Sequence, residues 1–131
     1  TITAANASQM TDGASGVLVA SEAAIKRFGL TPLARIVNLT VTAGDPVIML
    51  EEPIPATRKA FERSGLKLDD IDLFEVNEAF ASVVLRFMQA FDVDPARVNP
   101  NGGSIAMGHP LGATGAIIIG TLLDELERQP I

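Results

Sequence analysis

The amino-acid sequence predicts an α/β fold built around a mainly parallel β-sheet. Three times along the chain, an apolar or β-branched run is followed by a longer stretch with helical character. Short polar or glycine-rich segments follow the predicted strands, and ligands of parallel sheets gather at the carboxyl ends of the strands. We therefore expect the chemistry of this protein at one edge of the sheet.

The first predicted unit joins a strand at residues 2–5 to a helix at residues 13–28. Thr11 and Asp12 are good N-cap residues, and Gly29 is a typical helix stop. The predicted helix is small and apolar almost all round, which is typical of a helix that packs between two layers. We expect its packing partner to lie partly outside this chain.

The second predicted unit follows a connector at Pro32, where we place a domain boundary. Residues 34–42 are β-branched and apolar, which predicts a strand. Pro53-Ile-Pro55 then opens a helix that runs to about Ser64 and stops at Gly65. Its charged residues predict a solvated face, made of Arg58, Lys59, Glu62 and Arg63.

The third predicted unit is a short strand at residues 73–76, followed by a helix that starts at Asn77. Apolar side chains recur along this helix with helical spacing, which places them on one face toward a core. They are Phe80, Val83, Val84, Phe87, Met88 and Phe91. A last helix at residues 112–128 carries apolar residues on more than one face, so we expect it to be central and buried.

Composition excludes several classes of function. A chain of 131 residues is one domain's worth of protein, and a hydrophobic share of 47% is high for a unit of this size, so we expect its apolar faces to meet further protein. No apolar run approaches the ~20 residues that cross a bilayer. A net charge of -6 argues against nucleic acid as a partner. We expect the chain to be cut from a longer protein.

The sequence also lacks the residues for thiol chemistry and for a histidine-rich metal site. The chain contains no cysteine, which removes disulfides, thiolate metal sites and a thiol nucleophile. One histidine cannot build a cluster of histidine ligands, so we expect no metal site.

That histidine, His109, lies between Gly108 and Pro110 at the mouth of the last helix. Glycine permits close backbone approach, and Pro110 biases His109 away from the helical region, so the imidazole should be held in place. Histidine titrates near neutral pH, and a fixed imidazole can donate a hydrogen bond or move a proton. The alternative, left open by composition, is a histidine that only satisfies a buried carbonyl.

Three motifs make the sequence resemble the thiolases, and the resemblance extends over essentially the whole chain. The first two are specific in combination, while the third is weaker because the family often has glycine where this chain has Gln9. The motifs are Val76-Asn-Glu-Ala-Phe-Ala81, Asn101-Gly-Gly-Ser-Ile-Ala-Met-Gly-His-Pro-Leu-Gly-Ala-Thr-Gly115 and Asn6-Ala-Ser-Gln-Met-Thr-Asp-Gly13.

The resemblance implies a layered αβαβα fold in which two similar halves stack, with mainly parallel mixed sheets. Residues 1–29 would then be the last strand-helix unit of the first half, and residues 30–131 the second half, truncated before its final strands. It also implies a homodimer or homotetramer, located in the cytoplasm or in an organelle matrix.

Thiolases are acyltransferases that cleave 3-oxoacyl-CoA with CoA or run the reverse Claisen condensation of acyl-CoA. The resemblance therefore implies acyl-CoA and coenzyme A as substrates, with no permanently bound cofactor. The family uses one nucleophilic cysteine and a second cysteine that moves a proton, and this chain holds neither. We expect it to be inactive without the remainder of the polypeptide.

The resemblance also implies roles for four residues. His109 would donate to the developing oxyanion and help to activate the nucleophilic cysteine, and Asn77 would hold a water of the same oxyanion hole. Ser8 would lie near the pantetheine amides, with a local turn hydroxyl as the alternative. Phe80 would border the acyl and pantetheine end of the pocket, with core packing as the alternative. Glu78 is left out of this set, because a carboxylate in the first turn of a helix already suits the helix dipole.

Two other functions compete with a catalytic one. A nucleotide-binding loop has the spacing of Gly103 and Gly108, but it requires Lys and Ser or Thr where this chain has His109-Pro110. A non-catalytic thiolase-like protein that binds acyl-CoA or acts as a scaffold would keep the fold and the pocket without working cysteines.

Overall fold

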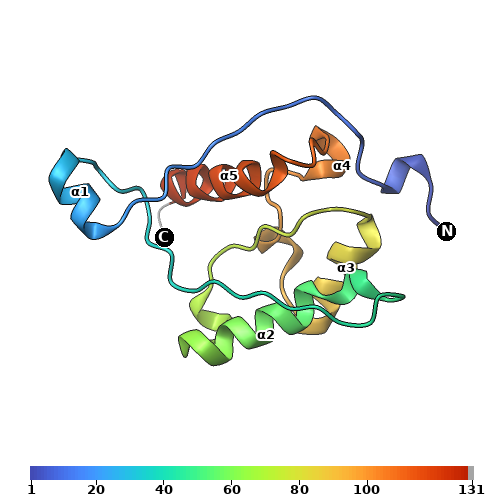
Figure 1. Cartoon of the computed structure of the whole chain (residues 1–131). Coiled ribbons are helices and arrows are strands. Elements are labelled where there is room, and N and C mark those ends of the chain that lie inside the picture. The colour runs from blue at the N-terminus through green and yellow to red at the C-terminus, as the bar shows by residue number, and fades with distance from the viewer. Residues whose placement is uncertain (130–131) are drawn as a thin grey trace.

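A computed structural model describes residues 1–129 of the chain, and Figure 1 shows their arrangement. Helices α4 and α5 lie on one side, α2 and α3 lie on the other, and the N-terminal segment runs along the outer side of α5. The α-helices are α1 (Glu22–Phe28), α2 (Pro53–Ser64), α3 (Ala81–Phe91), α4 (Ser104–Met107) and α5 (Thr114–Arg128). The 3-10 helices are η1 (Ala4–Asn6), η2 (Met49–Glu51), η3 (Leu68–Asp70) and η4 (Pro95–Arg97).

The hydrophobic core lies where α2 and α3 face the segment that precedes α3. Phe87 of α3 is its most buried side chain and packs against Phe74 and Phe91, with ring centroids 5.7 and 4.9 Å away. The apolar stripe predicted for α3 is confirmed as a core face from Val83 to Phe91, whereas Phe80 lies outside the helix and outside the core cluster. The buried core residues are Ile54, Phe74, Val76, Val84, Phe87, Val93 and Val98.

Helix α2 matches its prediction closely. Prolines stand in its first turn, where the missing N–H has no intrahelical partner to lose. Gly65 ends it with φ of 75°, a left-handed conformation that glycine adopts without steric cost. The four charged residues predicted on its solvated face are exposed.

The strand predicted at residues 73–76 forms a single parallel bridge, between Phe74 and Val98. Asn99 extends this pairing with its side chain, because its Oδ1 accepts from Val76 N at 2.7 Å and its Nδ2 donates to Val76 O at 2.8 Å. The backbone of Asn99 has φ of 48° and turns away, so the amide group substitutes for a further strand residue.

The helix predicted to start at Asn77 begins at Ala81 instead. Residues 77–80 are held by other partners: Phe80 forms an antiparallel bridge with Ala7, and the Ala79 carbonyl accepts from the Ser8 N–H at 3.1 Å. These contacts occupy backbone groups that a helix would use for its own first turn.

The first predicted unit is largely wrong. Residues 2–5 form no strand, and Thr3 and Asn6 satisfy each other's backbone groups around η1. The helix predicted at residues 13–28 forms only at α1, where Ser21 accepts from Ala24 N as the N-cap. A small-residue stretch with two glycines gains too little without a packing partner to offset helix nucleation. Its predicted end at Gly29 is confirmed.

The strand predicted at residues 34–42 is also not formed. The segment has no ladder with any residue in the described part of the chain, and its contacts are side-chain donors from α2 to the Leu39 and Val41 carbonyls. Strand propensity reflects packing against neighbouring strands, so an unpartnered segment stays irregular. Its apolar side chains are exposed, including Ile36, Val37, Leu39 and Val41, and so is the preceding Leu33.

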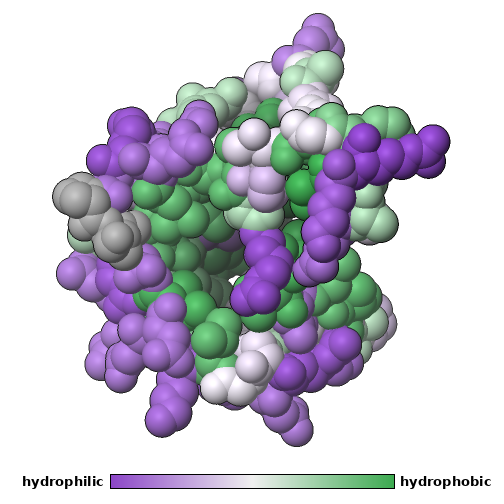
Figure 2. Space-filling view, turned by 90° about the vertical axis from the view of Figure 1, so that its left-hand side faces the viewer, coloured by the Kyte–Doolittle hydropathy of each residue, from purple (hydrophilic) through white to green (hydrophobic). Residues whose placement is uncertain are grey.

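Helix α5 is formed as predicted, but most of it is not buried within residues 1–129. Its only buried residues are Thr114 and Glu125, and Ile119 is 47% exposed. Figure 2 shows apolar side chains at the surface around a hollow on one side of the molecule. The layer that would bury α5 on its remaining faces does not occur within residues 1–129. None of the described helices is long and apolar enough to span a membrane.

Candidate active site

Three polar segments that are far apart in the sequence meet in the structure. His109 N donates to Gln9 O at 2.7 Å, and Met10 and His109 form a parallel bridge. Ser8 N donates to Ala79 O at 3.1 Å. The expected convergence of the Asn6, Asn77 and His109 segments is therefore confirmed, although it is carried by isolated bridges and not by a continuous sheet.

Close packing of the N-terminal segment on the His109 loop depends on glycine. Gly108 has φ of 97°, and a Cβ built on it would lie 2.5 Å from the Thr11 side chain. A Cβ on Gly13 would lie 2.7 Å from the Pro110 ring. Both separations are far inside van der Waals contact, so these glycines permit the two segments to touch.

The imidazole of His109 is partly buried and held by one defined partner. Its Nδ1 lies 2.7 Å from Thr114 Oγ1, and that hydroxyl also donates to the Pro110 carbonyl at 3.1 Å. A hydroxyl has one proton, so both hydrogen bonds form together only when Nδ1 is protonated and donates to Thr114. Nε2 is then the nitrogen that can accept a proton in the neutral ring and donate one in the imidazolium.

Asn77 is joined to the loop that leads to His109. Its Oδ1 accepts from Ser104 Oγ at 3.0 Å, and Ser104 is the first residue of α4. In the described part of the chain, the Asn77 Nδ2 group forms no hydrogen bond, so the contact with Ser104 orients the amide without using its donors.

Glu78 is tied to the same loop, and the helix-dipole explanation for it is wrong. Helix α3 begins three residues later, so Glu78 does not lie in its first turn. Its carboxylate accepts from Asn99 Nδ2 at 3.1 Å and from Ile105 N at 3.0 Å.

Ser8 and Phe80 lie where the N-terminal segment crosses the start of α3. Ser8 is partly buried, and it is its backbone N–H that bonds to Ala79. Phe80 is the N-cap residue of α3 and is partly buried, but it lies outside the hydrophobic core cluster.

Sequence reasoning missed three residues that shape this site: Asn99, Ser104 and Thr114. Thr114 could have been predicted from local spacing. It lies five residues after His109, in the first turn of a helix, where its hydroxyl can reach the imidazole. Asn99 and Ser104 act on partners more than twenty residues away, and no local pattern reports such contacts.

Glu75 is the carboxylate with the most perturbed titration. Burial raises its pKa from 4.5 to about 7, and the neighbouring Glu78 and Glu125 carboxylates add to the rise. Its Oε1 is buried without a hydrogen-bond partner among the described residues.

We expect Glu75→Gln to stabilise the chain at pH 8 and to flatten its pH dependence. The folded state binds the proton more tightly than the unfolded state, so this group's contribution is fully present below pH 4.5 and is lost as pH rises through about 7. The gain at pH 8 should be about 1 kcal/mol, because partial exposure screens the interaction. Urea unfolding between pH 5 and 8 measures it, with the exposed Glu62→Gln as the control, and an unchanged slope for Glu75→Gln would contradict the assignment.

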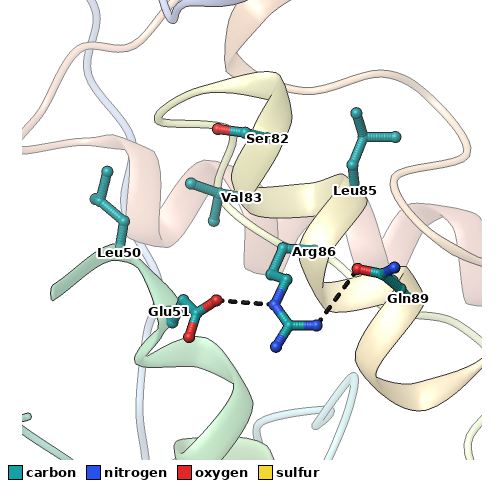
Figure 3. A pocket seen from close by; sticks show the side chains of 7 residues that line it. All are labelled: Leu50, Glu51, Ser82, Val83, Leu85, Arg86 and Gln89. Carbon is teal, nitrogen blue, oxygen red and sulfur yellow. Dashed lines mark hydrogen bonds and ion pairs between the residues drawn. The ribbon is translucent and has the colours of Figure 1, made fainter. Parts of the chain in front are cut away.

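One cleft of the molecule lies away from these residues. It measures about 650 Å³ and lies between η2 and α3, where Arg86 reaches across to Glu51 at 2.8 Å (Figure 3). Its lining includes none of the four predicted site residues. No group of three or more His, Asp or Glu side chains suited to a metal ion occurs among residues 1–129.

Comparison with known proteins decides the family. The model of the thiolase C-terminal domain matches residues 30–130. The chain belongs to the thiolase family. The thiolase resemblance seen in the motifs is thereby confirmed, and the fold is a thiolase-like α/β fold.

Several thiolases are close relatives. The steroid 3-ketoacyl-CoA thiolase FadA6 of Mycobacterium tuberculosis is 60% identical over 97% of this chain and 31% of its own length. The crystal structure of human mitochondrial 3-ketoacyl-CoA thiolase in complex with CoA superposes with a TM-score of 0.87 at 45% identity, over 97% of this chain and 32% of that one. The acetyl-CoA acetyltransferase of Bacillus anthracis gives a TM-score of 0.88 at 44% identity, with the same coverage. The chain thus spans about a third of the length of the thiolases it matches.

Proposed function

We propose that this chain is part of a longer acyltransferase that cleaves 3-oxoacyl-CoA with CoA, or runs the reverse condensation. The observation that carries the proposal is the tie between the His109 loop, the Asn77 segment and the N-terminal segment. These segments come from three distant stretches, and an imidazole and a carboxamide carried by neighbouring segments suit the stabilisation of a thioester oxyanion. Similarity to a thiolase crystallised with CoA supports coenzyme A as a substrate.

In the proposed mechanism, His109 works through Nε2, because Nδ1 is committed to Thr114. Nε2 accepts the proton of a cysteine thiol supplied by the remainder of the polypeptide, and the thiolate then attacks the substrate carbonyl carbon. The carbonyl π electrons move to oxygen, where the protonated His109 and a water held by Asn77 stabilise the negative charge.

The remaining roles follow the same proposal. Ser8 lies near the pantetheine amides and Phe80 borders the acyl and pantetheine end of the pocket. Residues 1–29 complete the first half of a layered αβαβα thiolase and residues 30–131 supply most of the second half, within a homodimer or homotetramer. The exposed apolar side chains of residues 33–41 and of α5 support burial against further protein.

A cleavage assay with 3-oxoacyl-CoA on the complete protein tests the proposal. We expect CoA-dependent cleavage, and mass spectrometry of the reaction should find an acylated cysteine outside this chain. Running the assay across acyl lengths defines the substrate range. Binding of acyl-CoA without cleavage or acylation would favour the non-catalytic alternative and reject the enzymatic one.

Thr114→Val should lower kcat of the complete enzyme about 10-fold or more, a fraction of the 10²- to 10⁴-fold contribution of a positioned general base. Valine keeps the size of the side chain but removes the acceptor for the Nδ1 proton, so the ring loses its preferred tautomer and orientation. Steady-state kinetics measures the loss, and Thr114→Ser, which keeps the hydroxyl, should restore most of the rate. Equal rates for the valine and serine variants would argue against this role.

A further inference from the structure

We propose that Glu78 is a positioning residue that holds the His109 loop against Asn77. This inference rests on the proposed thiolase function, because it concerns the alignment of the two groups assigned to the oxyanion hole. Glu78 would not touch the reacting atoms. It would act through residues 99–109.

The first support is that both oxygens of the Glu78 carboxylate accept hydrogen bonds from one loop. Oε1 accepts from Asn99 Nδ2 at 3.1 Å, and Oε2 accepts from Ile105 N at 3.0 Å. Hydrogen bonds to an ionised acceptor are stronger than those between neutral groups. One side chain therefore fastens the loop at two points six residues apart.

The second support is that α4 has no N-cap side chain of its own. Its N-cap residue is Gly103, which offers no acceptor for the free N–H groups of the first turn. The Glu78 carboxylate supplies that acceptor from a segment more than twenty residues earlier in the chain. A Cβ on Gly103 would lie 2.4 Å from the Glu78 Cδ atom, so the glycine gives the carboxylate its space.

The third support is the buried amide of Asn99. Asn99 is 8% exposed, and it uses Oδ1 and one Nδ2 proton to pair with Val76. The second Nδ2 proton goes to Glu78. Removing the carboxylate would leave this donor and Ile105 N–H without partners in a partly buried position, where an unsatisfied group is costly.

The path from Glu78 to His109 is short. Ile105 lies in the first turn of α4, and Gly108 N closes that helix by donating to Ser104 O at 3.0 Å. His109 follows directly, and Ser104 carries the contact to Asn77. A shift of α4 therefore moves the imidazole and the carboxamide relative to each other, and misplacement by ~1 Å can cost about 10²-fold in rate.

Glu78→Gln in the complete enzyme tests the inference, with Glu75→Gln as the matched control. Both changes replace a carboxyl group of the same cluster with an amide, but only Glu78 is hydrogen-bonded to the loop. We expect Glu78→Gln to lower kcat about 10- to 100-fold with KM changed less than about 3-fold, and Glu75→Gln to stay within about 2-fold of the parent.

A double substitution separates positioning from general loss of structure. If Glu78 acts through His109, adding Glu78→Gln to His109→Ala should change kcat by less than about 2-fold, because the group it positions is already gone. A full multiplicative loss in that background, or a parent-like kcat for Glu78→Gln alone, would overturn the inference.

Hydrogen exchange gives a readout that does not depend on activity. Amides of residues 104–109 should exchange at least about 10-fold faster in Glu78→Gln than in Glu75→Gln, while α3 keeps its protection. Equal exchange would overturn the positioning role even in an active enzyme. An inactive parent with the expected exchange pattern would reject the proposed function and leave the positioning of the loop supported.

Discussion

His109→Ala should lower kcat of the complete enzyme at least ~10²-fold, the usual effect of losing one oxyanion donor. The variant loses the donor to the substrate oxygen and the base that activates the thiol, and the buried hydroxyl of Thr114 loses one of its two partners. Among residues 1–129 the ring forms one side-chain hydrogen bond, to Thr114 of α5, so its removal should leave the backbone contact of His109 with Gln9 in place. Steady-state thiolysis at saturating substrate measures the change.

A matched control for this experiment lies two residues away. Met107 is 53% exposed in α4, so Met107→Ala perturbs the same loop without touching the imidazole, and its turnover should stay near that of the parent. His109→Gln refines the result, since glutamine keeps a hydrogen-bond donor but cannot exchange a proton at neutral pH. Unchanged turnover in His109→Ala would remove this residue from the mechanism.

The elements that the sequence predicted well are those with signals inside their own residues. Helix α2 is marked by Pro53 and Pro55 at its start and by Gly65 at its end, and these act through local backbone sterics. Helix α3 is marked by its apolar stripe, and the stripe is stable once one side of the helix packs against the core. The segments that carry the candidate site were likewise recognised from local motifs.

The elements predicted wrongly are those that depend on partners. Residues 34–42 have strand composition but no neighbouring strand within the described chain, and the small-residue stretch before α1 has no layer to pack against. Non-local hydrogen bonds could not be predicted from the sequence either. Glu78 is an example, because its two partners lie more than twenty residues away. Sequence periodicity reports which face a residue occupies, and not which distant group it meets.

The hydrophobic core and the candidate site are linked through Phe74. Its backbone N–H and C=O pair with Arg97 O and Asn99 N at 2.8 and 2.9 Å, so it holds the start of the loop that leads to His109. Its ring packs on Phe87 of the core. The order of the His109 loop therefore depends on the packing of the hydrophobic core.

Phe87→Ala should destabilise the chain by about 3 to 5 kcal/mol, the usual cost of truncating a buried phenylalanine. Phe87 is 2% exposed, and the deletion would leave a cavity bordered by two aromatic rings that are fixed by neighbouring elements. Urea unfolding measures the loss, and Leu85→Ala on the same helix, where the side chain is 61% exposed, should cost less than about 1 kcal/mol. Similar losses in the two variants would mean that α3 does not bury the face assigned to it, and the support for Phe74 and the His109 loop would have to come from elsewhere.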